Sequence, residues 1–208
     1  MAAESRLWTL ARKLQAAAQT GLEFNTNEYD RDRYRLISEI AAELMATHCD
    51  TPVETFRKMF NEQSGYATPK VDVRAAAFRD GKILLVREAA DGLWTMPGGW
   101  SDVNDSPREA VEREVWEESG FRVKATKLAA VYDRARHPHT PPMPFHIYKM
   151  FFLCEIIGGE AATSRETLEV GFFPPDALPP LSVSRNLEFQ IHRMFEHAKN
   201  PSLATDFD

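Results

Sequence analysis

The chain has 208 residues, of which 43% are hydrophobic and 27% charged, so it can bury one substantial core, or a catalytic domain plus a small accessory domain. A formal net charge of −6 argues against a nucleic-acid-binding surface spread over the whole protein, although a local basic channel stays possible. The sequence has no run of about 18 apolar residues and no signal peptide, which predicts a cytoplasmic protein without a membrane span.

Residues 1–65 are predicted to form a small domain of short amphipathic helices. Leucines repeat at helical spacing between residues 3 and 19, and Gly21 is expected to end this first helix. Asp30 should cap the second helix, and the third should begin within residues 51–54. Helices this short are rarely stable alone, so their apolar faces must pack on each other, on the second domain or on another subunit.

The apolar helix faces favour a homodimer, and we expect Trp8 to fill an interface with the second domain or with a partner subunit. A helix-turn-helix DNA reader is an alternative, but this segment lacks a cationic recognition helix. The two cysteines, Cys49 and Cys154, lie far apart and outside any metal-ligand spacing. They are predicted to be free thiols in a reducing compartment.

Residues 66–208 are predicted to form a second domain, which begins with a β-hairpin. Two strand-like runs at residues 71–78 and 82–88 are joined through Asp80-Gly81, a strong hairpin signal. A Pro- and His-rich loop at residues 134–146 should be an ordered lid or substrate loop. Further strands are expected at residues 93–96, 128–133 and 146–156. Residues 169–173 lead into a Pro-rich segment, and a last helix is expected from about Ser184.

A short helix rich in glutamate follows the turn Pro97-Gly98-Gly99. Ser106 is placed to cap this helix, Pro107 stands at its first position, and Gly120 is expected to end it. A sheet combined with this helix and the last one predicts an α/β sandwich.

Glu114, Glu117 and Glu118 stand at i, i+3 and i+4 and so share one helix face, whereas Glu112 points away. Like charges on one face repel each other unless a cation lies among them, and carboxylate oxygens are ligands that Mg²⁺ and Mn²⁺ prefer. A solvated acidic face is the alternative, but it leaves the preceding glycine turn unexplained.

Residues 99–121 resemble the signature of the Nudix hydrolase family, in which a glycine precedes an acidic helix at fixed spacing. The matching residues are Gly99, Arg113, Glu114, Val115, Glu117, Glu118 and Gly120. Asp105 stands where the family has glutamate, at a position that mostly holds the loop against the helix. Phe121 replaces an aliphatic residue, which is a packing variation. Similarity continues along nearly the whole chain, toward the subgroup that contains CDP-choline pyrophosphatase.

The resemblance implies an α/β (α+β) Nudix fold, in which a mixed sheet lies between helices, preceded by the small helical domain. It also implies hydrolysis of a nucleoside diphosphate linked to another group. CDP-choline, cleaved to CMP and phosphocholine, is the first preference, ADP-ribose is the nearest competitor, and RNA ends come third. Which phosphorus is attacked and how many metal ions bind are left open.

By the same resemblance, Glu114, Glu117 and Glu118 hold Mg²⁺ or Mn²⁺ together with the main-chain carbonyl of Gly98. Arg113 would orient the glutamates through charge-assisted hydrogen bonds, and it can equally act as a surface partner of Glu109 or Glu117. The general base is expected either in the signature or at Glu166 in a later loop.

Substrate contacts are expected from cations near the phosphates and from side chains that stack on or hydrogen-bond to the base. The candidates are Arg74, Tyr132, Asp133, Arg136, His137 and Lys149. His137 and His139 could also pass for zinc ligands, but they lack a third His or a Cys nearby. Two rival functions are a non-catalytic nucleotide sensor and an interaction module that uses the helical segment alone.

Overall fold

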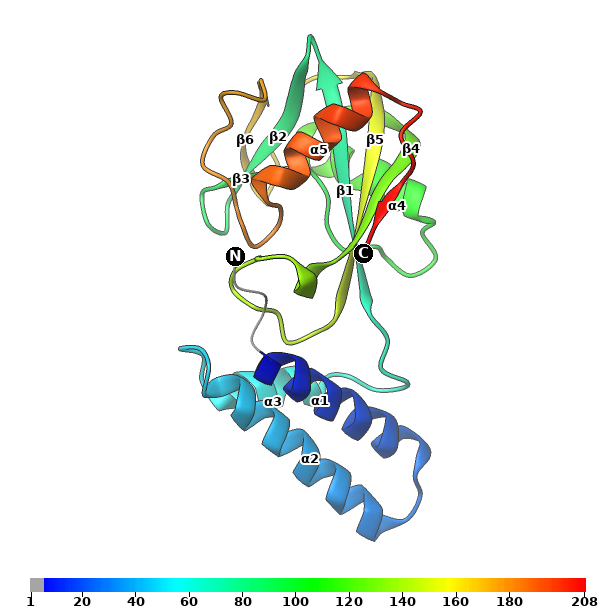
Figure 1. The fold of residues 1–208 in the computed structure, drawn as a ribbon, viewed down its shortest axis with the longest axis vertical. Helices are drawn as coiled ribbons and strands as arrows, with labels where there is room; N and C mark the ends of the chain where they lie inside the picture. Colours follow the sequence, from blue (N-terminus) through cyan, green and yellow to red (C-terminus); the bar gives the residue numbers. More distant parts are fainter. Residues whose placement is uncertain (1–5) are drawn as a thin grey trace. The chain divides into compact units, whose positions relative to one another are not determined.

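The computed structural model describes residues 6–208, which divide into two compact units (Figure 1). The helical unit contains the chain up to Lys70 together with residues 142–146. The second unit contains residues 71–141 and 147–208. The segment 142–146 therefore belongs with the helices, although it lies between two parts of the second unit in the sequence.

Three helices form the helical unit: α1 (Arg6–Phe24), α2 (Glu28–Ala46) and α3 (Val53–Asn61). Their core consists of Trp8, Ala11, Ala41, Ala42, Met45, Phe56 and Phe60. The Trp8 ring packs edge-on against Phe56, with 5.9 Å between the ring centroids. Trp8, which the sequence placed at an interface, is thus buried in the core of its own unit.

The boundaries of these helices differ from the expectation at two places. Helix α1 does not end at Gly21 but continues to Phe24, and a Cβ at Gly21 would lie 2.4 Å from the Tyr34 ring. The glycine therefore serves the close approach of α1 to α2 and not a helix stop. Asn27, and not Asp30, caps α2, because its side chain accepts a hydrogen bond from the backbone N–H of Tyr29 at 2.9 Å.

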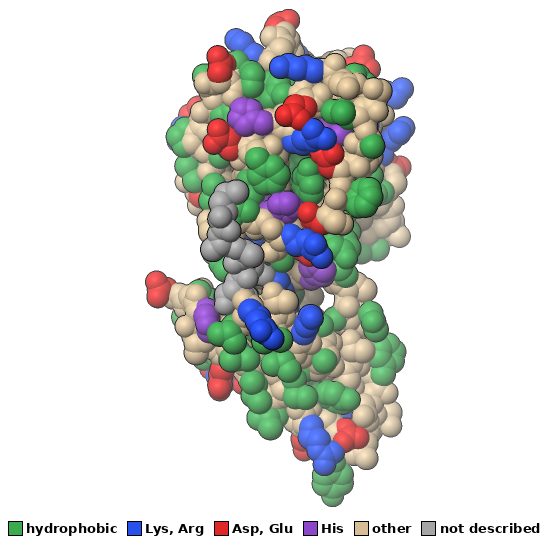
Figure 2. All heavy atoms as spheres, in the orientation of Figure 1, with side chains coloured by type: hydrophobic (Ala, Val, Ile, Leu, Met, Phe, Trp, Pro, Cys, Tyr) green, Lys and Arg blue, Asp and Glu red, His purple; other side chains and the backbone are tan. Residues whose placement is uncertain are grey.

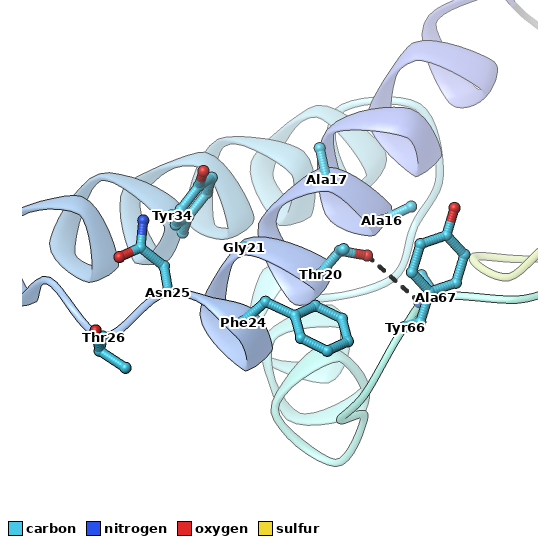
Figure 3. Close-up of a pocket in the computed structure, with 10 residues that line it drawn as sticks. All are labelled: Ala16, Ala17, Thr20, Gly21, Phe24, Asn25, Thr26, Tyr34, Tyr66 and Ala67. Carbon is cyan, nitrogen blue, oxygen red and sulfur yellow. Dashed lines mark hydrogen bonds between the residues drawn. The ribbon is translucent and has the colours of Figure 1, made fainter.

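A groove of about 680 Å³ opens on the helical unit near the end of α1. Its lining is Ala16, Ala17, Thr20, Gly21, Phe24, Asn25, Thr26, Tyr34, Tyr66 and Ala67. Figure 3 shows the Thr20 hydroxyl, which accepts a hydrogen bond from the Ala67 N–H at 3.4 Å, beside the rings of Phe24 and Tyr66. Phe24 and Tyr66 are each 69% exposed. Hydrophobic side chains also spread over the visible face of the helices in Figure 2.

The second unit is built on a seven-stranded mixed sheet. The strands are β1 (Lys70–Arg79), β2 (Lys82–Glu88), β3 (Trp94–Thr95), β4 (Phe121–Asp133), β5 (Ile147–Gly159), β6 (Thr167–Phe173) and β7 (Asp206–Phe207). Their order is β3-β2-β1-β5-β4-β7, with β6 also paired to β2. Strand β7 runs parallel to β4, while β4 and β5 are antiparallel. The sequence did not predict β7, and β4 begins earlier than expected, directly after the acidic helix.

Helices α4 (Pro107–Ser119) and α5 (Glu188–Lys199) cover opposite faces of this sheet. Successive residues of β1 show the division, because Ala75 lies in the core with α4 and Ala76 in the core with α5. In Figure 1, α5 lies in front of the strands. The predicted α/β sandwich is confirmed, although α5 begins at Glu188 and not near Ser184.

Local signals set the ends of α4 and the first hairpin as predicted. Ser106 Oγ accepts the Glu109 N–H, and the Glu109 carboxylate accepts the Ser106 N–H at 2.9 Å. Gly120 ends the helix with φ 74°. Asp80 and Gly81 both have positive φ, as a two-residue hairpin turn of type I′ requires.

Within residues 6–208, no helix is long and apolar enough to cross a membrane. Cys49 and Cys154 are both free thiols, as expected. The cytoplasmic location stays a prediction from the sequence.

Replacing Gly120 by alanine should destabilise the second unit more than the same change at Gly92. Both glycines have φ near 70° (74° and 71°), but a Cβ at Gly120 would lie 2.5 Å from the Glu160 carbonyl oxygen. At Gly92 no described atom lies within 4 Å. We expect Gly92→Ala to cost about 1–2 kcal/mol and Gly120→Ala about 3 kcal/mol or more, measured by urea unfolding. Equal losses of unfolding free energy in the two variants would show that the close approach to Glu160 adds no cost at Gly120.

Candidate active site

The turn Pro97-Gly98-Gly99 lies directly against β1. The N–H groups of Ala75 and Val73 donate to the carbonyls of Pro97 and Gly99 at 2.9 and 2.8 Å. Gly98 has φ 139°, and a Cβ there would lie only 2.0 Å from the Val73 carbonyl oxygen. Only glycine allows the turn to approach the strand so closely.

Glu118 of α4 is joined to this turn. Its buried carboxylate accepts the Gly98 N–H at 2.8 Å. Burial raises the pKa of Glu118 to about 8, against the opposing effects of the Arg74 charge and the Gly98 N–H. The charges of Glu88 and Glu114 raise it further. The site thus holds a buried carboxylate whose negative charge is incompletely balanced.

Arg113 ties the other acidic side chains together. Its Nη1 donates to Glu114 at 2.8 Å and to Glu117 at 3.0 Å, and its Nε donates to Asp105 at 3.0 Å. Arg113 thus contacts two of the glutamates and the loop aspartate, and its role in orienting metal ligands stays a prediction. Burial raises the pKa of Glu114, although Arg113 opposes this effect.

The donor chemistry at the turn fits a divalent cation. A Cβ on Gly99 would lie 2.7 Å from a carboxylate oxygen of Glu114, so Glu114 and Glu118 both lie at the turn. Glu117 is half exposed and drawn toward Arg113. Accordingly, in the described part of the chain no three His, Cys, Asp or Glu side chains already form a ligand set. A cation at the turn would stabilise the charged forms of Glu114 and Glu118, whose pKa values burial raises.

Two of the expected substrate contacts, Arg74 and Lys149, are buried together around Asp72. Arg74 donates to both Asp72 oxygens at 3.0 and 2.8 Å, and Lys149 Nζ donates to one of them at 2.6 Å. These two cations lower the pKa of Asp72 to about 2, against the effect of burial. Sequence reasoning missed Asp72, although its i, i+2 spacing from Arg74 places both on one face of β1.

The other four expected contacts lie around the short 3₁₀ helix η1 (Arg134–Arg136), next to the C-terminal segment. The Tyr132 hydroxyl donates to Asp206 at 3.2 Å. His137 Nε2 lies 3.0 Å from Asp208. The Asp133 side chain caps η1, and Arg136 is 69% exposed. The candidates therefore form two groups, and their role in substrate binding stays a prediction.

Glu166, the candidate general base, lies exposed just before β6, and its backbone N–H donates to Ser164 Oγ at 3.1 Å. Glu88 is an acidic residue that sequence reasoning missed. It is buried at the end of β2, lies 2.7 Å from Arg185 Nε, and has a pKa raised by burial. Only its position on a strand facing the site could have identified it.

The zinc alternative gains no support from the two histidines. His139 is buried, its Nδ1 lies 2.9 Å from the Val183 carbonyl oxygen, and burial lowers its pKa to about 3. His137 pairs with Asp208 instead. Neither histidine belongs to a metal-binding group of three side chains among residues 6–208.

Carboxylates of one helix lie on a glycine turn, above a sheet covered by helices on both faces. Residues 68–193 match the family described as the NUDIX domain, so the chain belongs to the Nudix hydrolase family and is a pyrophosphatase. Residues 5–60 match the family described as the UDP-X-like, N-terminal oligomerisation domain. Nudix hydrolases generally use divalent metal ions.

Three similar proteins extend this comparison. YjhB of Bacillus subtilis, whose name assigns it provisionally to the ADP-ribose pyrophosphatases, is 42% identical over 198 residues and 95% of each chain. An ADP-ribose pyrophosphatase structure from Streptococcus suis is 42% identical, with a TM-score of 0.62 over 68% of this chain and 100% of that one. A UDP-X diphosphatase structure is 30% identical, with a TM-score of 0.63 over the full length of both chains.

Replacing Asp72 by asparagine should strongly destabilise the second unit, because Arg74 and Lys149 would stay buried without their partner. We expect a loss of about 3–5 kcal/mol in the free energy of unfolding at pH 7. The control is Glu169→Gln, which removes an exposed ion pair to Arg87 of the same 2.6 Å length and should cost about 1 kcal/mol or less.

The stability of the second unit should also depend on pH through Asp72. The pKa of Asp72 is lowered from 3.8 to about 2, so its stabilisation is present above pH 3.8 and lost as pH falls toward 2. The stability of the wild type should therefore fall more steeply over this window than that of Asp72→Asn. Parallel curves would contradict the ion-pair assignment.

Proposed function

We propose that this protein cleaves the pyrophosphate bond of a nucleoside diphosphate linked to a second group, with Mg²⁺ or Mn²⁺ as its cofactor. One observation carries the proposal: the buried Glu118 carboxylate is held on the Gly98 N–H, beside Glu114, with its pKa raised by burial. A carboxylate in that state favours a bound cation.

Glu114, Glu117 and Glu118 would hold the ion, with the Gly98 carbonyl as a further oxygen ligand. When bound, such an ion polarises a phosphoryl oxygen and lowers the pKa of water. Arg113 orients Glu114 and Glu117 through its hydrogen bonds. Glu166 stays our candidate for the general base, since it lies in a loop next to the buried Glu88.

For the substrate we now rank ADP-ribose first, cleaved to AMP and ribose 5-phosphate. The names of two relatives, each 42% identical to this chain, support this order. We rank UDP conjugates next, because a similar structure is named a UDP-X diphosphatase. CDP-choline, the first preference from the sequence resemblance, stays a prediction that the same experiment tests. RNA ends remain the third class of substrate.

The test is a panel of ADP-ribose, a UDP-sugar, CDP-choline and a short RNA with Mg²⁺, with the released phosphate species identified by mass spectrometry. Glu118→Gln should lower kcat by at least about 100-fold with the fold intact, because it removes a charged ligand but keeps the shape. Glu112→Gln is the control, since Glu112 points away and accepts the Ala125 N–H instead. Unchanged turnover in Glu118→Gln would contradict the site, and binding without turnover in the wild type would favour the sensor.

We also propose that the protein is a homodimer joined through the groove at the end of α1. The match of residues 5–60 to an oligomerisation domain supports this proposal, as do the exposed rings of Phe24 and Tyr66 beside the groove. A second copy would bury these two rings and stabilise the pair by about 1.5–3 kcal/mol for each ring.

The double variant Phe24→Ser/Tyr66→Ser should therefore shift the dimer to a monomer in light scattering after gel filtration. Tyr29→Ser is the control, because Tyr29 is 78% exposed but does not line the groove. If the monomeric variant hydrolyses the substrate as the wild type does, the helical unit serves in assembly. If its substrate selectivity changes, the helical unit contributes to the substrate site. An unchanged dimer would exclude this groove as the interface.

A further inference from the structure

The two residues before the glycine turn are held by a side chain that lies far away in the sequence. Asn186 stands between β6 and α5, and its Oδ1 accepts the Met96 N–H at 2.7 Å and the Thr95 hydroxyl at 2.5 Å. Thr95, Met96 and Asn186 are all fully buried, at 0% exposure. One oxygen of a buried amide therefore fixes the backbone as it enters the turn.

The carbonyl group of Met96 is held by Arg74. Its Nη1 donates to the Met96 carbonyl at 3.2 Å, and Asp72 in turn binds the rest of the guanidinium group. Both polar groups of Met96 are thus bound by side chains and not by a neighbouring strand. Two residues further on, the Gly98 N–H reaches the Glu118 carboxylate.

The Asn186 amide is held at a cost. Its Nδ2 is buried and has no hydrogen-bond partner within the described chain. A buried unpaired donor costs about 1–3 kcal/mol, but an apolar side chain of similar size would leave the buried Met96 N–H without its acceptor instead. The Asn186 oxygen is therefore required where the chain enters the turn, because it is the side-chain acceptor of the Met96 N–H.

We propose that Asn186 is a positioning residue for the hydrolase. By fixing Thr95 and Met96, it holds the Gly98 amide in register with Glu118 and sets the direction of the Gly98 carbonyl toward a divalent ion. It acts only through the turn and does not touch the substrate. This inference rests on the proposed function, since it assigns Asn186 to the same metal site.

The test compares three variants of the full-length protein. Asn186→Leu removes the acceptor, Asn186→Asp keeps an acceptor oxygen in a side chain of the same shape, and Gln190→Leu is the matched control. Gln190 is equally buried and lies in the first turn of α5, but its amide binds the Leu187 N–H and His139. All three are checked by circular dichroism and thermal unfolding.

We expect Asn186→Leu to lower kcat by about 10- to 100-fold with KM nearly unchanged, and Asn186→Asp to restore most of the loss. Binding of Mn²⁺, followed by the electron paramagnetic resonance signal of the free ion, should weaken about 10-fold in Asn186→Leu. Gln190→Leu should lose stability but keep both kcat and Mn²⁺ affinity.

Equal kcat and Mn²⁺ affinity in Asn186→Leu and Gln190→Leu would overturn the inference, as would an Asp variant that is folded but as impaired as the Leu variant. If Asn186→Leu does not fold, Asn186→Ala replaces it, because it removes the acceptor without adding bulk. A wild type that cleaves no conjugate would overturn the proposed function, while the Mn²⁺ measurement would still decide the role of Asn186.

Discussion

The hydrogen bond from the Gly98 N–H to the Glu118 carboxylate joins the two parts on which the site depends. The turn is held on β1 by backbone hydrogen bonds, and α4 is held at both ends by its cap and by Gly120. Together with the apolar packing of α4 on the sheet, this contact holds the acidic helix face beside the turn. Only glycine fits at position 98, because a Cβ there would lie 2.0 Å from the Val73 carbonyl oxygen of β1.

Buried charge is the second constraint on this unit. Arg74 lies between a structural partner, Asp72, and the acidic residues of the site, and its charge lowers the pKa of both Glu118 and Glu114. Without that cation, burial would favour the protonated carboxyl groups even more strongly. Arg74, a candidate for substrate contact, therefore also stabilises the charged forms of Glu114 and Glu118.

The features predictable from the sequence are those whose cause lies within a few residues. The Ser106 cap, the Gly120 stop and the Asp80-Gly81 hairpin each depend on local backbone geometry, and the structure confirms all three. Gly21 and Asp72 were misread or missed because their roles come from Tyr34 and Lys149, which become neighbours only after folding. For the same reason the sequence places three glutamates on one helix face but does not reveal that Arg113 draws Glu117 aside.

The chain visits the helical unit twice, first up to Lys70 and again at residues 142–146. On this return, Phe145 packs against the three-helix core and the Arg12 side chain donates to the Met143 carbonyl at 3.2 Å. Deleting the three helices would therefore not remove the whole helical unit. The shortened chain would keep residues 142–146, and the Phe145 ring would lose the apolar core that it packs against. To isolate the second unit, both the chain up to Lys70 and residues 142–146 would have to be removed.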